Sequence, residues 1–308
     1  MKRIVVAGET NVDVVLCGAT AEPGREALAD DCVMTLGSAS AICAMGLARL
    51  GNPVSFVSRV GADLWGDYCL GVLQSAGIDT AHVVRDPDLK TGITVSISSG
   101  GDRALVTYLG SIDSVTDADV PDAVLKGAAH LHVSSFFLQS RLRPDVSRLF
   151  ARARANGLTT SLDPGFDPQQ RWNGGLDPAI DAADLFFPNE GELLGIARRP
   201  NAPEGLRALA GRRARTIVKL GSSGAMTLEQ DQVLQASAFR VKPVDTTGAG
   251  DSFNAGFLHA FLRGETLLDC LVAGNACGAL STRALGGTAA QPTLDEMTRL
   301  VQTAVERR

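Results

Sequence analysis

The sequence predicts an α/β fold with a parallel sheet covered by helices on both faces, together with a small second β-sheet. Apolar runs of strand length alternate with helical patterns along most of the chain, which is typical of βαβ units. Two regions break this alternation, because their apolar residues recur at every second position, as in half-buried strands. Residues 245–251 form a turn of small residues before an amphipathic helix, an arrangement that favours binding of an anion.

The expected core strands are short apolar runs, as suits strands that are buried on both faces. They comprise residues 4–7, 54–60, 131–133, 159–162, 185–187 and 216–220, and residues 242–244 are expected to end a further strand. The expected helices comprise residues 41–50, 65–76, 144–156, 190–196 and 252–262. No linker or internal repeat divides the chain, so residues 1–308 are expected to form a single domain.

The two regions with a period of two residues are expected to form the second sheet. Residues 11–16 and 31–36 make the first pair of strands, and residues 91–98 and 103–109 make the second. The second pair is joined by Ser99-Gly100-Gly101-Asp102, a composition that favours a hairpin turn.

Composition argues for a cytoplasmic enzyme rather than a nucleic-acid-binding or membrane protein. The chain has 308 residues, a net charge of −5 and 5% aromatic residues, and no basic run gives support for nucleic-acid binding. Its apolar stretches are of strand length, and the N-terminus leads directly into a first strand, which favours neither a membrane span nor a signal peptide. The six cysteines lack a CxxC pair and the four histidines lack a metal spacing, so reduced thiols are expected and a metal role for histidine is not.

The turn before the last predicted helix carries the strongest functional signal. Gly248 and Gly250 permit positive φ and let a phosphate approach the bare N–H groups of the first helical turn. Asp251 stands in this anion-binding turn, where a carboxylate would repel phosphate unless it accepts a proton from an attacking hydroxyl. Considered alone, Asp251 is equally typical of an ordinary helix N-cap.

The run Asp245-Thr246-Thr247-Gly248-Ala249-Gly250-Asp251 closely resembles the C-terminal signature of the ribokinase-like (PfkB) family of carbohydrate and nucleoside kinases. The resemblance spans essentially the whole chain and implies a Rossmann-like three-layer core of ribokinase type. It also implies a β-sheet lid, formed by segments of about 11–36 and 83–110, that covers the phosphoryl acceptor. Asp251 would then be the catalytic base, and the backbone of Gly248, Ala249 and Gly250 would form the anion hole. The P-loop and dinucleotide-binding motifs do not occur.

Two further segments indicate an acceptor site. Asp13 follows the first strand, where open α/β sheets bind ligands, and its carboxylate can accept hydrogen bonds from two sugar hydroxyls. The spacing fits a solvent-exposed loop carboxylate equally well, but the resemblance to the family's Asn-x-Asp element favours substrate binding. Gly37 and Ser38 stand at the family's first signature and are implied acceptor contacts. There Ser38 replaces a second glycine and Ile42 replaces the usual asparagine, which removes polar contacts.

Arg103 and Asp163 are additional candidates for substrate binding. Arg103 lies in the lid hairpin, where it can contact an acid or a phosphate or simply face solvent. Asp163 ends a core strand and is a candidate for contact with substrate or with metal-bound water.

The remaining candidates concern the nucleotide and metal ions. Pro188-Asn189-Glu190-Gly191-Glu192 fits the family's Asn-x-x-Glu motif, in which Asn189 and Glu192 hold Mg²⁺ through water, although both also suit a helix N-terminus. The resemblance further implies two sets of contacts. These are ATP contacts at Lys219, Gly221, Gly224, Gly248, Gly250 and Asn275, the last beside adenine, and a K⁺ site formed by Asp245, Thr247 and the loop 282–287.

The leading function is ATP-dependent phosphorylation of a hydroxyl group on a small sugar, with Mg²⁺ as cofactor. A neutral sugar is favoured because Leu109 and Gly110 follow Tyr108 where kinases of 2-keto-3-deoxygluconate carry an arginine. A sugar-acid or nucleoside kinase is the alternative within the family, and a non-catalytic sugar or nucleotide sensor is the alternative of another class. The partner is expected to be a small molecule, with a contact between two lids, as in dimeric relatives, as a further possibility.

Overall fold

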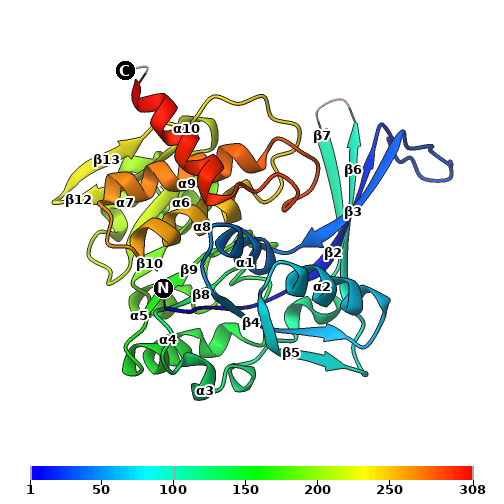
Figure 1. Cartoon of the computed structure of the whole chain (residues 1–308), viewed down its shortest axis with the longest axis horizontal. Helices are drawn as coiled ribbons and strands as arrows, with labels where there is room; N and C mark the ends of the chain where they lie inside the picture. Colours follow the sequence, from blue (N-terminus) through cyan, green and yellow to red (C-terminus); the bar gives the residue numbers. More distant parts are fainter. Residues whose placement is uncertain (1, 100–101, 307–308) are drawn as a thin grey trace.

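The computed structural model describes residues 2–99 and 102–306, and its centre is a nine-stranded sheet (Figure 1). The strands are β1 (Ile4–Ala7), β4 (Val54–Gly61), β5 (Asp79–Asp86), β8 (His130–Val133), β9 (Thr159–Leu162), β10 (Leu185–Phe186), β11 (Arg215–Lys219), β12 (Ala225–Glu229) and β13 (Gln232–Ala236). Their order is β13-β12-β11-β10-β9-β8-β1-β4-β5. Neighbours from β11 to β5 pair in parallel, and β12 and β13 extend the sheet in antiparallel orientation.

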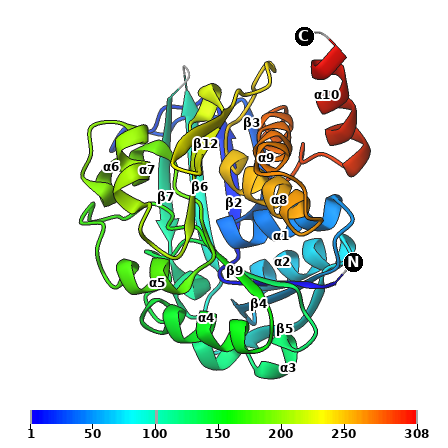
Figure 2. The same cartoon turned by 90° about the vertical axis from the view of Figure 1, so that its left-hand side faces the viewer.

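Helices cover both faces of this sheet, which confirms the predicted α/β class (Figure 2). One layer contains α1 (Ala39–Arg49), α2 (Leu64–Ser75), α8 (Ala249–Phe261), α9 (Leu267–Ser281) and α10 (Leu294–Glu306). The other contains α3 (Asp122–Leu125), α4 (Val146–Ala155), α5 (Leu176–Ala182), α6 (Glu190–Ala197) and α7 (Ala202–Leu209). Because side chains alternate along a strand, Ile4 and Val6 of β1 enter the first core, and Val5 and Ala7 enter the second.

The second sheet has the order β3-β2-β6-β7 and projects away from the large sheet (Figure 1). Its strands are β2 (Asn11–Cys17), β3 (Asp31–Gly37), β6 (Gly92–Ser99) and β7 (Asp102–Tyr108). The β2–β6 pair is parallel, and the outer pairs are antiparallel. The expected lid segment from residue 83 starts too early, since residues 83–86 belong to β5 of the large sheet. The centre of the predicted hairpin turn, Gly100-Gly101, lies outside the described residues.

The prediction of a strand end at 242–244 is wrong, because this segment is irregular. Pro243 has no N–H group to contribute to a ladder, and the N–H groups of Val244 and Asp245 both donate to the carbonyl of Thr282, at 2.7 and 3.1 Å. The turn before α8 is therefore held by a loop that follows α9, and not by a strand of the sheet.

A chain of buried hydrogen bonds joins the two central strands β8 and β9. Thr159 Oγ1 lies 2.7 Å from His130 Nδ1, and Ser161 Oγ lies 2.7 Å from both His130 Nε2 and His132 Nδ1. His132 Nε2 continues to Ser134 Oγ at 2.8 Å. Burial lowers the pKa of His130 to about 3 and that of His132 to about 4, so both imidazoles are neutral at pH 7.

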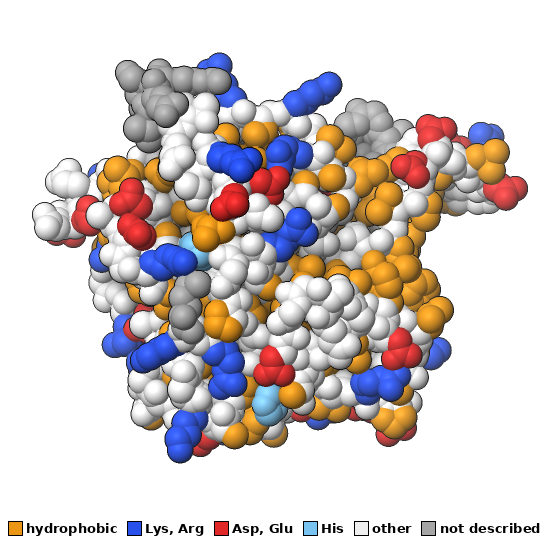
Figure 3. Space-filling model, viewed as in Figure 1, with side chains coloured by type: hydrophobic (Ala, Val, Ile, Leu, Met, Phe, Trp, Pro, Cys, Tyr) orange, Lys and Arg blue, Asp and Glu red, His pale blue; other side chains and the backbone are white. Residues whose placement is uncertain are grey.

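The surface carries charges of both signs, which are interspersed on the face shown in Figure 3. Strand β7 presents apolar side chains to solvent, with Leu105, Val106 and Tyr108 exposed by 56%, 65% and 54%. Within the described residues, no helix combines the length and the apolar character that crossing a bilayer requires.

Candidate active site

The predicted site residues gather where the parallel strands end. Lys219 is the last residue of β11, Asp163 directly follows β9, and Asn189 lies shortly after β10. Their side chains meet at the carboxyl edge of the sheet, the usual ligand-binding position in open α/β folds. The N-terminus of α8 points to the same edge and brings Asp251 there.

The turn before α8 depends on glycine. Gly248 is the N-cap with φ 71°, and Ala249 begins the helix. A Cβ on Gly248 would lie 2.9 Å from Gly287 Cα and 3.0 Å from Ile42 Cγ2, so the turn is packed between the 282–287 loop and α1. The first N–H groups of a helix have no carbonyl partner within it, which suits this turn to an anion.

A buried ionic cluster lies beside this turn. Lys219 Nζ donates to Asp163 Oδ2 at 2.6 Å, and Asn254 Nδ2 donates to the same oxygen at 2.6 Å. The N–H of Gly165 donates to Asp163 Oδ1 at 2.9 Å. The carboxylate of Asp163, which was predicted to contact substrate or metal-bound water, is thus occupied by three donors of the protein.

The charges of this cluster shift the pKa of Asp251. Burial and then the charge of Asp163 raise the pKa of Asp251 to about 7, against the opposing effect of Lys219. Glu9 and Glu192 act in the same direction as Asp163. The result is a carboxyl group that changes protonation near neutral pH, as a general base requires.

Asn189 and Glu192 form a capping box at the start of α6. Asn189 Oδ1 accepts from the Glu192 N–H at 2.9 Å, and Glu192 Oε2 accepts from the Asn189 N–H at 2.8 Å. Burial and the charge of Asp163 raise the pKa of Glu192 to about 7. Each side chain uses one oxygen in the box, and the carboxylate has a second, so the pair fits Mg²⁺ contacted through water. The described residues contain no group of three or more His, Cys, Asp or Glu arranged as a metal cage.

The predicted acceptor residues form a separate cluster at the base of the small sheet. Asn11 Nδ2 donates to Asp13 Oδ1 at 3.1 Å, and Ser38 Oγ donates to Asn11 Oδ1 at 2.8 Å. A Cβ on Gly37 would overlap the Asp13 carboxylate, so glycine lets these strands approach. Ser38 is the N-cap of α1 and adopts φ 73°, which is unusual for a residue with a Cβ. Arg103 lies on β7, but its side chain is outside the described part of the chain.

The residues implied as nucleotide contacts occupy the β11–β12 turn and α9. Gly221 and Gly224 both have positive φ, and a Cβ on Gly224 would overlap the Ala236 carbonyl. Asn275 donates from its amide nitrogen to the carbonyls of Ala236 and Ser237, at 2.9 and 3.2 Å. Its amide group therefore joins α9 to the end of β13.

Asp245, implied in a K⁺ site, fastens two loops together. Its Oδ1 accepts from the N–H and the hydroxyl of Thr247, at 2.9 and 2.8 Å, and its Oδ2 accepts from the Gly286 N–H at 2.8 Å. The loop 282–287 thus lies against the turn before α8, as the resemblance implies.

Sequence reasoning assigned no role to two polar residues of the site. Asn254 lies one helical turn after Asp251, a spacing that places both on the same side of α8. Glu9 lies two residues after the end of β1, and its buried carboxylate accepts from Ser40 Oγ at 2.8 Å. Burial raises the pKa of Glu9. The positions of both residues, one turn from the base and at a strand end, are the signals that could have identified them.

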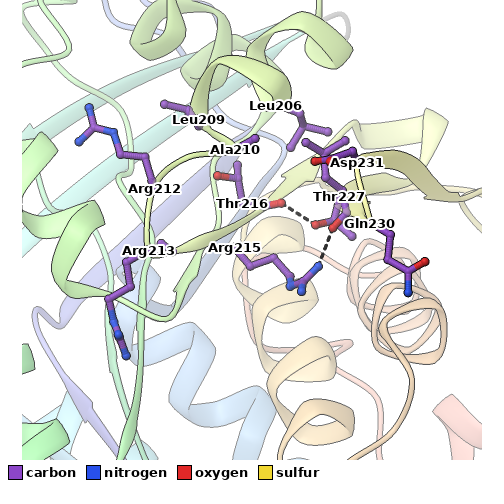
Figure 4. Close-up of a pocket in the computed structure, with 12 residues that line it drawn as sticks. Leu206, Leu209, Ala210, Arg212, Arg213, Arg215, Thr216, Thr227, Gln230 and Asp231 are labelled. Atoms are coloured by element: carbon purple, nitrogen blue, oxygen red, sulfur yellow. Dashed lines mark hydrogen bonds between the residues drawn. The ribbon is translucent and has the colours of Figure 1, made fainter.

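A cavity of about 260 Å³ lies elsewhere, between α7 and the β11–β12 hairpin (Figure 4). Leu206, Thr216 and Leu228 line it, and Arg215 at its edge donates to the Leu228 carbonyl. Arg215 and Thr216 lie at the start of β11, whereas Lys219 is at its end. The cavity therefore opens away from the ionic cluster of the site.

The comparison with protein families agrees with this geometry. A family described as pfkB family carbohydrate kinase matches residues 1–294. The chain belongs to the pfkB family of carbohydrate kinases. The match confirms the family that the turn at 245–251 predicts, and the protein is accordingly a kinase.

Individual relatives within the pfkB family have different printed activities. The chain is 31% identical to the 2-dehydro-3-deoxygluconokinase of Bacillus subtilis, over 85% of each chain. It is also 31% identical to the ATP-dependent ribose-1-phosphate kinase of Halopiger xanaduensis, over 96% of each chain. Among solved structures, a fructokinase from Vibrio cholerae O395 in a form with bound fructose, ADP and calcium ion has a TM-score of 0.83 and 26% identity, covering 98% of this chain and 99% of that one.

Proposed function

We propose that this pfkB kinase transfers the γ-phosphoryl group of ATP to a hydroxyl group of a small neutral sugar, with Asp251 as the general base. The observation that carries the proposal is the position of Asp251, whose pKa is about 7, in the first turn of α8 directly after Gly248-Ala249-Gly250. A carboxylate at an anion-binding turn is suited to take a proton from the attacking hydroxyl as negative charge arrives beside it.

The chemistry follows from this arrangement. The acceptor hydroxyl gives its proton to Asp251 while its oxygen forms a bond to the γ-phosphorus, and the bond from that phosphorus to the β,γ-bridging oxygen breaks, so that ADP leaves. The N–H groups at Gly248, Ala249 and Gly250 receive the transferred group. Mg²⁺, when bound, neutralises charge on the phosphates, and Asn189 and Glu192 are the residues to hold its water shell.

The proposed acceptor site is the cluster at the base of the small sheet. Asp13 and Asn11 present a carboxylate and an amide, and Gly37 leaves room beside them. Such groups recognise hydroxyls by accepting and donating hydrogen bonds. The small sheet is the proposed lid, which excludes water that would otherwise compete for the phosphoryl group.

The substrate class is the least constrained part of the proposal. The relatives include kinases named for a sugar acid, a sugar phosphate and a neutral sugar. Leu109 and Gly110 follow Tyr108 in this chain, so no arginine stands there for an acid group. A neutral sugar is therefore our first choice, with a sugar acid or a nucleoside as the second.

A panel of acceptors tests the proposal directly. The purified protein is incubated with Mg·ATP and, separately, with neutral sugars, sugar acids, sugar phosphates and nucleosides, and ADP formation and the phosphorylated product are measured. We expect product from at least one neutral sugar, with the highest kcat/KM in that class. Preference for an acid, a phosphate or a nucleoside would replace the substrate and keep the kinase, whereas an enzyme inactive on every class would leave a non-catalytic sensor as the better hypothesis.

A further inference from the structure

Lys219 occupies a more constrained position than a general nucleotide contact requires. A Cβ on Gly250 would lie 3.4 Å from its Nζ, so the ammonium group lies against the anion-binding turn itself. Only 12% of the Lys219 side chain and 5% of the Asp163 side chain are exposed, and their charged atoms are 2.6 Å apart. Lys219, the cation among the charges that shift the pKa of Asp251, is thus held beside the turn that would receive the phosphoryl group.

Asp163 is itself held firmly by its neighbours. Asn254 donates to the oxygen that receives Lys219, and the Gly165 N–H donates to the other oxygen. Asn254 belongs to α8, three residues after Asp251, whereas Lys219 ends β11. One carboxylate therefore fastens the helix that carries the base to the strand that carries the cation.

We propose that Asp163 is a positioning residue that fixes the ammonium group of Lys219 beside the anion-binding turn, where Lys219 stabilises the negative charge of the phosphoryl group in transit. This inference rests on the kinase function proposed above and assigns roles within it. Asp163 acts through Lys219 and does not contact the acceptor. Lys219 acts on the transferred group itself.

The ammonium group of Lys219 needs a partner that holds it in place. A lysine ammonium is a point charge on a flexible four-carbon stem, so it holds no fixed place unless a partner orients it. A charge that is already in place lowers the barrier without reorganisation during the reaction. A buried ion pair adds little net stability compared with an apolar pair of similar volume, so stability alone does not account for Asp163 and Lys219.

The cluster also sets the working state of the base. Asp163, Glu192 and Glu9 all raise the pKa of Asp251, and Lys219 lowers it. Burial alone would lower the pKa of Lys219, but Asp163, Glu192 and Asp251 together raise it, so the lysine remains charged. Loss of Lys219 must therefore move the ionisation of Asp251 to higher pH.

The test is a double-mutant cycle on the full chain with Lys219→Met, Asp163→Asn and the double variant. Using the best acceptor, we expect Lys219→Met to lower kcat by about 10²–10³-fold, as for loss of one preorganised donor to a transition-state anion. KM values should change by less than about threefold, and the acidic limb of the pH profile should move upward. At pH values where Asp251 is ionised in every variant, Asp163→Asn should lower kcat strongly in the wild-type background and not at all in the Lys219→Met background.

Asp184→Asn is the control, because it removes an ion pair, more exposed than that of Asp163, which lies directly before β10 at the amino edge of the sheet. Asp184 Oδ1 accepts from Arg213 at 2.6 Å, and its Oδ2 accepts from the Thr160 N–H at 2.8 Å. This variant should lose thermal stability and keep both kcat and the pH profile. If Asp163→Asn alone fails to fold, the double variant keeps the test valid, since it contains no unpaired lysine charge.

Two outcomes would contradict the proposed roles of Lys219 and Asp163 without contradicting the kinase function. Wild-type kcat in Lys219→Met removes the role of Lys219. Losses of kcat that multiply in the double variant show that Asp163 acts independently of Lys219, for example by touching the acceptor. Failure of the wild-type protein to phosphorylate any acceptor is a different result, which contradicts the proposed function itself.

Discussion

The carboxyl edge of the large sheet and the small sheet differ in how their polar and apolar groups are arranged. At the edge, Asp163, Lys219 and Asn254 are buried and paired with one another, and little of their surface is left to solvent. In the small sheet, by contrast, Leu105 and Val106 of β7 are exposed to solvent. The first region is preorganised for chemistry, whereas the second has an apolar surface that is suited to cover something else.

The largest effect is expected from the preorganised region. Asp251→Asn keeps the size of the side chain but cannot accept the proton, so kcat should fall by about 10²–10⁴-fold while ATP binding is retained. Turnover with the best acceptor and calorimetric titration of ATP measure the two parts. Asp269→Asn, which changes an acid in the first turn of α9, controls for the effect of a helix-terminal charge. Near-normal turnover of Asp251→Asn would rule out the base.

The same assignment predicts the pH dependence. Because the base must be ionised and its pKa is about 7, kcat/KM should rise about tenfold per pH unit below pH 7 and level off above it. Glu192 also has a raised pKa of about 7, and Glu192→Gln separates the two groups. The rise of kcat/KM below pH 7 should persist in the Glu192→Gln variant. Its disappearance there would assign the ionisation to Glu192.

A smaller effect is expected at the start of α6. Glu192→Gln should raise the Mg²⁺ concentration needed for half-maximal activity by about tenfold, since a carboxylate that orients metal-bound water is lost. Acceptor KM should change less. Glu190→Gln changes the exposed neighbour in the same helical turn and should leave the magnesium titration unchanged. Equal titrations for both variants would show that Glu192 only caps the helix.

Binding of the acceptor alone, without phosphoryl transfer, should change the hydrogen exchange of the small sheet. If it closes as a lid, the acceptor should slow hydrogen exchange in the described residues of β6 and β7, while exchange in β12 and β13, the hairpin at one edge of the large sheet, stays the same. Mass spectrometry of peptides with and without acceptor measures both. Equal exchange of β6 and β7 in the two conditions contradicts closure.

The smallest predicted effect on catalysis concerns a contact between subunits. We expect the apolar face of β7 to meet a second copy of the chain, because an open sheet with exposed apolar side chains needs a partner. Val106→Lys should then halve the mass measured by solution scattering and leave most of kcat. Val233→Lys provides a comparison, since it places the same charge at an exposed apolar residue of β13, in the large sheet. A wild-type monomer would remove the contact.

The sequence predicted β1, β4, β8, β9, β10 and β11 of the large sheet, because buried parallel strands carry apolar runs, as in β1, but it did not predict β5, β12 and β13 as strands of this sheet. It failed at 242–244, where Val241 and Val244 lie on either side of Lys242-Pro243 and the backbone pairs with Thr282, a partner that is remote in the sequence. The assignment of residues 83–86 to the lid was also wrong, because a pattern of alternating apolar and polar residues suits an edge strand of either sheet.

The sequence could identify which site residues lie at strand ends, but not the hydrogen bonds that join them. Asp251, Asn189 and Lys219 each follow from a local motif. The bonds that Asp163 receives depend on β9, β11 and α8 coming together, which no local pattern records. The side-chain amide of Asn275 shows the same limit, because its partners at 236 and 237 are given by tertiary packing alone.

The buried hydrogen-bond chain between β8 and β9 has a consequence for how the strands find their pairing. Apolar strands tolerate several alignments, because one aliphatic side chain can replace another. Moving β9 by one residue would turn Ser161 to the opposite face of the sheet and leave both His130 and His132 without it. His130 would then lose both of its partners and His132 would keep only Ser134, which leaves buried imidazole nitrogens unsatisfied at a cost in free energy. The hydrogen-bond chain between β8 and β9 thus fixes the register of β9, the strand that directly precedes Asp163.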